Sequence, residues 1–161
     1  MNLFKPKEIL NIYSDLDIKK YAELGYKAIF LDIDNTIAIS RIGNLDKKNE
    51  KFIDELQNNG IKVVIFSNAK RKRVLNFLQG KKLDYTYYSL KPLPFMFWIE
   101  SLKLRIKPSS ILVLGDQLMT DILGANLSGC YGIYTKQLSN SDTFLTSINR
   151  RIEKFIWRHM T

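Results

Sequence analysis

The sequence contains little cysteine, histidine or proline. Its 161 residues include one cysteine, Cys130, one histidine, His159, and four prolines. A lone cysteine cannot form a disulfide within the chain, so we expect a reduced structural thiol and a cytoplasmic protein. We interpret His159, close to the end of the sequence, as a solvated side chain.

No apolar run approaches the length of a membrane span. The longest runs have about five or six residues, whereas a helix needs about 20 to cross a bilayer. The opening stretch MNLFKPKEIL has neither an apolar h-region nor a small-residue cleavage site. We therefore expect neither a transmembrane helix nor a signal peptide.

Acidic residues are fewer than basic residues. Twenty-five lysines and arginines face 16 acidic residues, which gives a formal net charge of +9. Such a surface attracts nucleic acid, anionic lipid or phosphorylated substrates, and the charge alone selects none of them. Biased base composition explains a lysine-rich chain equally well. The basic run at residues 70–73 contains no aromatic side chain, and we expect no specific nucleic-acid partner.

Apolar stretches of strand length alternate with stretches of helical periodicity. Strands are predicted at residues 27–33, 62–66, 83–88, 111–114 and 131–135. Helices are predicted at residues 46–59, 70–79, 92–106, 118–128 and 142–160. The strands are continuously apolar, as in parallel sheets that are buried on both faces. The pattern predicts an α/β fold, a three-layer Rossmann-like parallel sheet of about five strands with helices on both faces.

The chain length suits one domain. We assign residues 26–161 to it, and residues 1–25 to an N-terminal extension with a short helix at 18–24, packed on the core. About 30 residues separate Asp34 from Ser67, and a helix and a strand use most of them. The spacing predicts no large cap domain, and therefore an open crevice.

Polar residues follow the predicted strands at the points where they end. Asp32 and Asp34 end the first strand, Ser67 and Asn68 follow the second, and Asp116 follows the fourth. Ligands of open α/β sheets bind outside the carboxyl ends of the strands, so these residues should meet in one crevice. We expect one of the first two carboxylates to point into the crevice and the other to lean over it.

The residue types at this edge suit phosphoryl transfer. Oxygen ligands from Asp32, the Asp34 carbonyl, Asp116 and Asp121 suggest Mg²⁺. Ser67 and Asn68 can offer a hydroxyl and a main-chain N–H to an anion, and Lys91 supplies a cation. A carboxylate nucleophile, a second acid, a metal and donors for a phosphoryl group complete such a site.

The motifs resemble those of the haloacid dehalogenase-like phosphatase superfamily. Asp32-Ile-Asp34-Asn35-Thr36, Ser67-Asn68, Lys91-Pro92 and the run from Gly115 to Asp121 are similar to its four motifs, in the same order. The GDQLMTDILGAN stretch and the tail SDTFLTSINRRIEKFI further resemble the bacterial YqeG family, which is grouped with phosphatidylglycerophosphatase. Departures are Leu127 and Ser128, where arginine or glycine is expected, and TKQL, which lacks an expected proline.

The resemblance implies roles for the individual residues. Asp32 would attack phosphorus, and Asp34 would protonate the leaving oxygen and then activate water. Mg²⁺ would sit on Asp32, the Asp34 carbonyl and Asp116, with Asp121 binding directly or through water. Phosphoryl oxygens would be held by Thr36, Ser67 and Lys91. The implied substrate is phosphatidylglycerophosphate, an anionic lipid reached by peripheral contact with the inner face of the membrane.

Several alternatives remain open or are excluded. An EF-hand is excluded, because Ile37 and Gly43 stand where glycine and glutamate are required. A response-regulator receiver domain is disfavoured by Asp116 and Asp121. A phosphatase of soluble sugar, nucleotide or protein phosphates stays open, as does a remote non-enzymatic binding module.

Two apolar stretches have two interpretations each. The predicted C-terminal helix, with its stripe of Leu145, Ile148, Ile152 and Phe155, either docks on the sheet or lets its end FIWRHM touch a membrane. Phe95, Phe97 and Trp98 either pack in the core or contact acyl chains.

Overall fold

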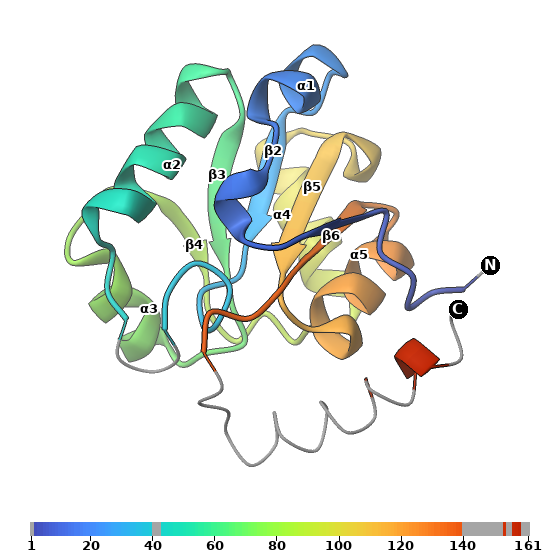
Figure 1. Ribbon diagram of the computed structural model, residues 1–161. Helices are drawn as coiled ribbons and strands as arrows, with labels where there is room; N and C mark the ends of the chain where they lie inside the picture. The colour runs from blue at the N-terminus through green and yellow to red at the C-terminus, as the bar shows by residue number, and fades with distance from the viewer. Residues whose placement is uncertain (1, 40–42, 140–152, 154–155, 159–161) are drawn as a thin grey trace.

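The computed structural model describes residues 2–39, 43–139, 153 and 156–158. One sheet of six parallel strands, in the order β1-β6-β5-β2-β3-β4, forms its centre (Figure 1). The strands are β1 (Glu8–Leu10), β2 (Ala28–Leu31), β3 (Lys62–Phe66), β4 (Asp84–Thr86), β5 (Ile111–Gly115) and β6 (Tyr131–Thr135). This is the predicted α/β architecture.

Helices follow the strands and cover both faces of the sheet (Figure 1). They are α1 (Ile18–Glu23), α2 (Lys47–Asn58), α3 (Arg71–Leu78), α4 (Pro94–Leu104) and α5 (Leu123–Ser128). Local chemistry sets their ends: the Asp46 side chain accepts a hydrogen bond from the backbone N–H of Asn49 at the start of α2. Pro94 begins α4, where its missing N–H costs nothing.

Alternate residues of each central strand enter different apolar clusters. Ile29 and Leu31 join the cluster under α2 and α3. Phe30, which lies between them, joins the cluster under α4 and α5, where its ring stacks on Phe66 at 4.9 Å. Successive side chains of a strand point to opposite faces, so a continuously apolar strand needs a layer on each side. The three-layer arrangement follows.

The N-terminal segment contributes a strand as well as a helix. Where about five strands were expected, the structure has six, because β1 pairs in parallel with the edge strand β6. Only Leu10 of its three residues is buried, so the segment carries too short a pattern to be recognised. Tyr13 and Tyr21 pack beneath it in the larger core cluster, and the Tyr13 hydroxyl donates to Asn49 Oδ1 at 2.7 Å.

Several predicted element boundaries differ from the observed ones near the carboxyl ends of the strands. The first central strand ends at Leu31 rather than at residue 33, and β4 ends at Thr86 rather than at residue 88. The helix predicted over 118–128 is divided into a π-helical turn, Leu118–Ile122, followed by α5. Buried Asp32 directly follows the end of β2, and buried Asp121 lies within the π-helical turn, so two of these departures coincide with buried acidic side chains.

The predicted C-terminal helix lies mostly outside the described residues, and so does its stripe of Leu145, Ile148, Ile152 and Phe155. The described positions contact the core. Glu153 Oε1 accepts a hydrogen bond from the Met119 backbone N–H at 3.1 Å, and the Trp157 ring meets Tyr134 edge-on at 5.5 Å. Among the residues that the structure describes, no helix is long and apolar enough to cross a membrane.

Candidate active site

Four neighbouring strands deliver polar side chains to one edge of the sheet. Asp32 follows β2, Ser67 follows β3, Lys91 lies in the loop after β4, and Asp116 follows β5. Because β2 lies between β5 and β3 and all three run in parallel, their carboxyl ends meet. The structure therefore brings Asp32, Lys91, Asp116 and Asp121 into one buried group.

Lys91 lies at the centre of this group. Its Nζ donates to Asp32 Oδ1 and to Asp121 Oδ1, both at 2.7 Å, and to the Phe66 carbonyl at 2.9 Å. Burial disfavours the ammonium charge, but the attraction of Asp121 and Asp32 outweighs it and raises the pKa of Lys91 above its ordinary value. This side chain therefore stays charged at any physiological pH.

Asp32 is buried beside that ammonium. Burial raises the pKa of its carboxyl to about 6, with Lys91 acting in the opposite sense and the charges of Asp121 and Asp34 adding to the rise. The Thr36 hydroxyl lies 3.2 Å from Asp32 Oδ2 and 3.1 Å from Asp116 Oδ1. Thr36 thus links two carboxylates of the group, and Lys91 links Asp32 to the third.

The three carboxylates form a group suited to a cation. Oxygen atoms of Asp32, Asp116 and Asp121 lie within 4.8 Å of one another, and all three side chains are buried. The Lys91 ammonium pairs with two of them, Asp32 and Asp121. All the donors are hard oxygens, the ligands that Mg²⁺ prefers, so these residues fit a divalent cation.

Gly115 makes room for one of these carboxylates. A Cβ atom placed on Gly115 would lie 2.2 Å from Cγ of Asp121, well inside van der Waals contact. The π-helical turn places the Asp121 side chain there, and the Gln117 backbone N–H donates to its Oδ2 at 3.2 Å. The glycine of the GDQLMTD stretch is therefore required by packing against the acid six residues later.

Asp34 pairs with an arginine of α3. Its Oδ1 accepts two hydrogen bonds from Arg73, at 2.8 Å from Nη2 and 3.1 Å from Nε. Asp32 and Asp34 both lie beyond the end of β2 at Leu31, where the alternation of a regular strand no longer sets the direction of a side chain. Sequence reasoning missed Arg73, although its place in the first turn of α3, just after the Ser67-Asn68 motif, was a signal.

Asn68 holds the backbone of Lys91. Its Oδ1 accepts from the Lys91 backbone N–H at 2.9 Å and from the Ser89 hydroxyl at 3.0 Å, while its Nδ2 donates to the Lys91 carbonyl at 3.0 Å. The Ser67 hydroxyl accepts from the Ala69 backbone N–H at 3.1 Å. The amide side chain thus fixes the lysine loop, while the predicted contact of Ser67 and Asn68 with phosphate stays a prediction.

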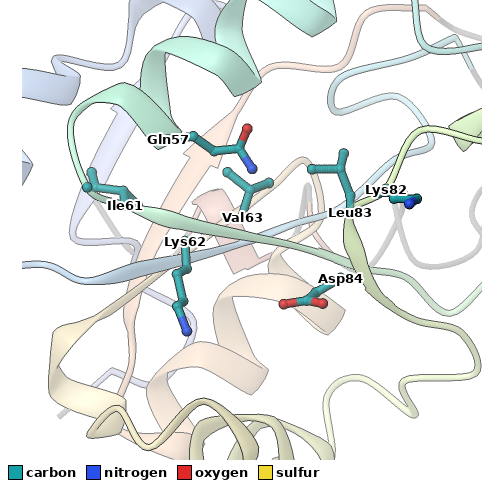
Figure 2. A pocket seen from close by; sticks show the side chains of 8 residues that line it. Gln57, Ile61, Lys62, Val63, Lys82, Leu83 and Asp84 are labelled. Carbon is teal, nitrogen blue, oxygen red and sulfur yellow. The ribbon is translucent and has the colours of Figure 1, made fainter.

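A cavity of about 620 Å³ lies at the other edge of the sheet. It opens at the amino ends of β3 and β4, where Gln57, Lys62, Leu83 and Asp84 line it (Figure 2). None of the carboxylates grouped around Lys91 lines this cavity. This cavity is therefore separate from the candidate active site at the carboxyl ends of the strands.

Comparisons with known proteins identify the family of this chain. Residues 29–90 match the model of the haloacid dehalogenase-like hydrolases, and residues 90–152 match a second, HAD-hydrolase-like model. The chain is 31% identical over 153 residues to "Probable phosphatase YqeG" of Bacillus subtilis, covering 95% of this chain and 89% of the relative. The chain belongs to the haloacid dehalogenase-like phosphatases. Within them it is related to YqeG, as its motifs predicted.

The chain also resembles a second sequence relative and a solved structure. A Schizosaccharomyces pombe protein named "Probable phosphatidylglycerophosphatase, mitochondrial" is 28% identical and covers 93% of this chain and 77% of its own. The cobalt-bound deoxy-D-mannose-octulosonate 8-phosphate phosphatase of Haemophilus influenzae superimposes with a TM-score of 0.56 at 13% identity, over 71% of this chain and 70% of that one. The latter match shows the shared fold.

Proposed function

We propose that this phosphatase works with Mg²⁺ through an aspartyl-phosphate on Asp32 and that its substrate is phosphatidylglycerophosphate. The observation that carries the mechanism is the buried group of Asp32, Lys91, Asp116 and Asp121. Oxygen atoms of the three buried carboxylates lie within 4.8 Å of one another, and the Lys91 ammonium pairs with two of them. This arrangement supports a site that receives a cation and a phosphoryl group.

In the first step an oxygen of Asp32 attacks phosphorus, and the bond from phosphorus to the leaving oxygen breaks. Thr36 and Lys91, bonded to different oxygens of Asp32, fix the orientation of this carboxylate. Asp34 gives its proton to the leaving oxygen. Arg73 holds one oxygen of the Asp34 carboxyl through two hydrogen bonds and so limits its orientation.

In the second step water attacks the phosphorus of the aspartyl-phosphate. Asp34, now ionised, takes a proton from that water, and the bond between phosphorus and Asp32 breaks to release inorganic phosphate. Lys91 compensates the negative charge of the phosphoryl oxygens. Asp32, Asp116 and Asp121 would hold Mg²⁺, with the Asp34 carbonyl as a further ligand, and the bound cation supplies additional charge neutralisation at those oxygens.

Three observations support a lipid substrate. A relative that aligns with 93% of the chain is named as a phosphatidylglycerophosphatase. Between Asp34 and Ser67 the described chain forms only a loop, α2 and β3, so no lid is built over the acidic group there. The net charge of +9 favours an anionic surface. A chain with this net charge and no lid domain in its described part between Asp34 and Ser67 can approach a head group that remains in a bilayer.

The test is phosphate release with Mg²⁺ from phosphatidylglycerophosphate in mixed micelles, compared with a panel of soluble phosphate esters. Asp32→Asn serves as the inactive variant, and Asp84→Asn, an exposed carboxylate at the opposite edge, as its matched control. We expect turnover of the lipid far above that of the panel, loss in Asp32→Asn and no loss in Asp84→Asn. Turnover of soluble esters alone would retain the mechanism and refute the lipid substrate.

A further inference from the structure

Exposed apolar side chains gather beside the active site, in the segment that joins β4 to α4 and in the first turn of α4. Five of them are exposed by 40–57%, and together they form what we call the apolar rim: Tyr87, Tyr88, Leu90, Leu93 and Phe95. Soluble monomers rarely expose large apolar side chains so close together. Buried Lys91 belongs to the same segment, so the apolar rim borders the catalytic edge.

The backbone of this segment is held in an unusual conformation. Tyr88 and Leu90 have φ angles of 47° and 53°, in the left-handed region that disfavours residues with a Cβ. The intervening Ser89 is fully buried and donates to Asn68. The chain thus turns Ser89 and Lys91 inward while their apolar neighbours face outward. Strained backbone of this kind concentrates at functional segments.

The apolar surface continues along the outer side of α4. Phe95, Trp98, Ile99 and Leu102 are exposed at spacings of three and four residues, which places them on one stripe of the helix. Phe97 points the other way and is fully buried against Phe30 and Phe66. Of the aromatic residues with two interpretations, Phe97 therefore packs in the core, whereas Phe95 and Trp98 face outward.

Exposed basic residues flank the apolar rim. The Tyr88 backbone N–H donates to the Ala69 carbonyl at 3.1 Å, which places the rim next to the start of α3. Lys70, Arg71 and Lys72 follow Ala69 and are exposed. A second copy of this chain docked on the rim would bring these like charges together. An anionic lipid surface offers the opposite charge and an apolar interior a few ångströms below it.

We infer that the apolar rim, flanked by residues 70–72, is the surface by which this protein docks on an anionic bilayer. Leu90, Leu93 and Phe95 would enter the boundary of the acyl chains, and the tyrosines would lie among the head groups, where their rings have both apolar and polar partners. Docking by this surface turns the active-site opening toward the lipid. The inference rests on the proposed lipid substrate and names the surface that reaches it.

The first test is sedimentation of the full chain with vesicles of phosphatidylglycerol and phosphatidylcholine. The double variant Leu90→Asn, Phe95→Ser removes two apolar side chains, and asparagine suits the left-handed backbone at residue 90. Leu24→Ser is the matched control, because Leu24 is 65% exposed at the end of α1, at the opposite edge of the sheet (Figure 1). We expect vesicle binding to fall roughly tenfold in the double variant and to remain unchanged in Leu24→Ser.

A second pair of variants tests the basic residues beside the apolar rim. The two variants lose the same number of positive charges, so they have the same net charge. One replaces Lys70, Arg71 and Lys72 by glutamine. The other replaces three exposed lysines at the opposite edge by glutamine: Lys19 in the first turn of α1, Lys27 just before β2, and Lys62 at the start of β3. We expect a loss of roughly tenfold or more in the first variant only, diminishing as salt is added. Equal losses in both variants would show general attraction and overturn the docking surface.

Hydrolysis of a soluble aryl phosphate separates this inference from the proposed function. All these variants should keep the wild-type rate, since none of the substituted side chains contacts the acidic group; a folded rim variant that loses vesicle binding at full rate supports the inference. Wild-type vesicle binding by the rim variants overturns it, even if the lipid is hydrolysed. Self-association of the wild type that is abolished in the rim variants, without vesicle binding, would instead assign the rim to a second copy.

Discussion

Arg73 donates two hydrogen bonds to Oδ1 of Asp34, from Nη2 at 2.8 Å and from Nε at 3.1 Å. This pair joins the start of α3 to the loop after β2. The Arg73 side chain is 14% exposed and that of Asp34 28% exposed. A partly buried pair with this geometry orients a carboxylate more strongly than a surface pair does. Arg73 is therefore a positioning residue for the proposed general acid.

Arg73→Ala should lower kcat by roughly 10²-fold, within the range that a positioned acid contributes, and leave KM nearly unchanged. The loss should be larger for an alkyl phosphate than for p-nitrophenyl phosphate, whose leaving group needs no proton. Arg73→Lys should restore part of the rate. Exposed Arg71 in the same helical turn provides the control, Arg71→Ala. Equal losses for both leaving groups would contradict a link to proton transfer.

Asn68→Ala should misplace Lys91. The substitution removes three hydrogen bonds that hold the backbone on both sides of Lys91 and the Ser89 hydroxyl. Misplacement of a charged group by about 1 Å lowers turnover by roughly 10- to 100-fold, and steady-state kinetics would measure it. Asn126→Ala, which also removes hydrogen bonds from a side-chain amide to backbone carbonyls, should leave turnover unchanged because it acts on the N-terminal segment. Comparable losses in the two variants would point to a general loss of structure.

Gly115→Ala should displace the Asp121 carboxylate, because the new Cβ would overlap its Cγ. We expect activity to fall sharply and the apparent affinity for Mg²⁺, measured by calorimetry, to decrease. Gly132→Ala is the control, since its Cβ would meet Ala125 Cβ at 3.2 Å, Ile122 Cδ1 at 3.5 Å and Ile122 Cα at 3.8 Å, and no carboxylate. Unchanged Mg²⁺ affinity in Gly115→Ala would remove Asp121 from the proposed metal site.

Mg²⁺ should raise the melting temperature of the wild type. Oxygen atoms of three buried carboxylates lie within 4.8 Å of one another, so a divalent cation bound among them would stabilise the folded state. We expect a rise of at least about 3 °C, the shift that roughly 1 kcal/mol produces in a domain of this size. Asp116→Asn should reduce this response. An undiminished response in Asp116→Asn, with Asp84→Asn for comparison, would place the cation elsewhere.

Cys130 should resist alkylation in the folded protein. Burial raises the pKa of its thiol to about 11, from an ordinary value of 9.0, so little thiolate forms at pH 8. As pH rises above 9, the unfolded chain releases this proton while the folded chain retains it, and the free energy of unfolding decreases. Iodoacetamide at pH 8 should therefore react slowly with native protein and rapidly in urea. Because the chain has one cysteine, the label reports this site alone.

The sequence by itself determined the class of fold and most of the acidic group. Runs such as 62–66 and 111–114 are apolar on both faces, which requires a covered parallel sheet, and polar residues after such strands must gather at one edge. Asp32, Lys91, Asp116 and Asp121 could be named for that reason. Their convergence depends on strand order, and a parallel sheet offers few alternatives for consecutive βα units.

Tertiary structure decided what depends on contacts between segments distant in sequence. A three-residue strand such as β1 is stabilised by pairing with β6, and its own pattern is too short to indicate it. The pairing of Arg73 with Asp34, the use of the Asn68 amide to hold Lys91, and the separation of outward Phe95 from buried Phe97 all depend on where loops and helices pack. Side-chain direction at the end of a strand has no period, so only the packed chain could determine it.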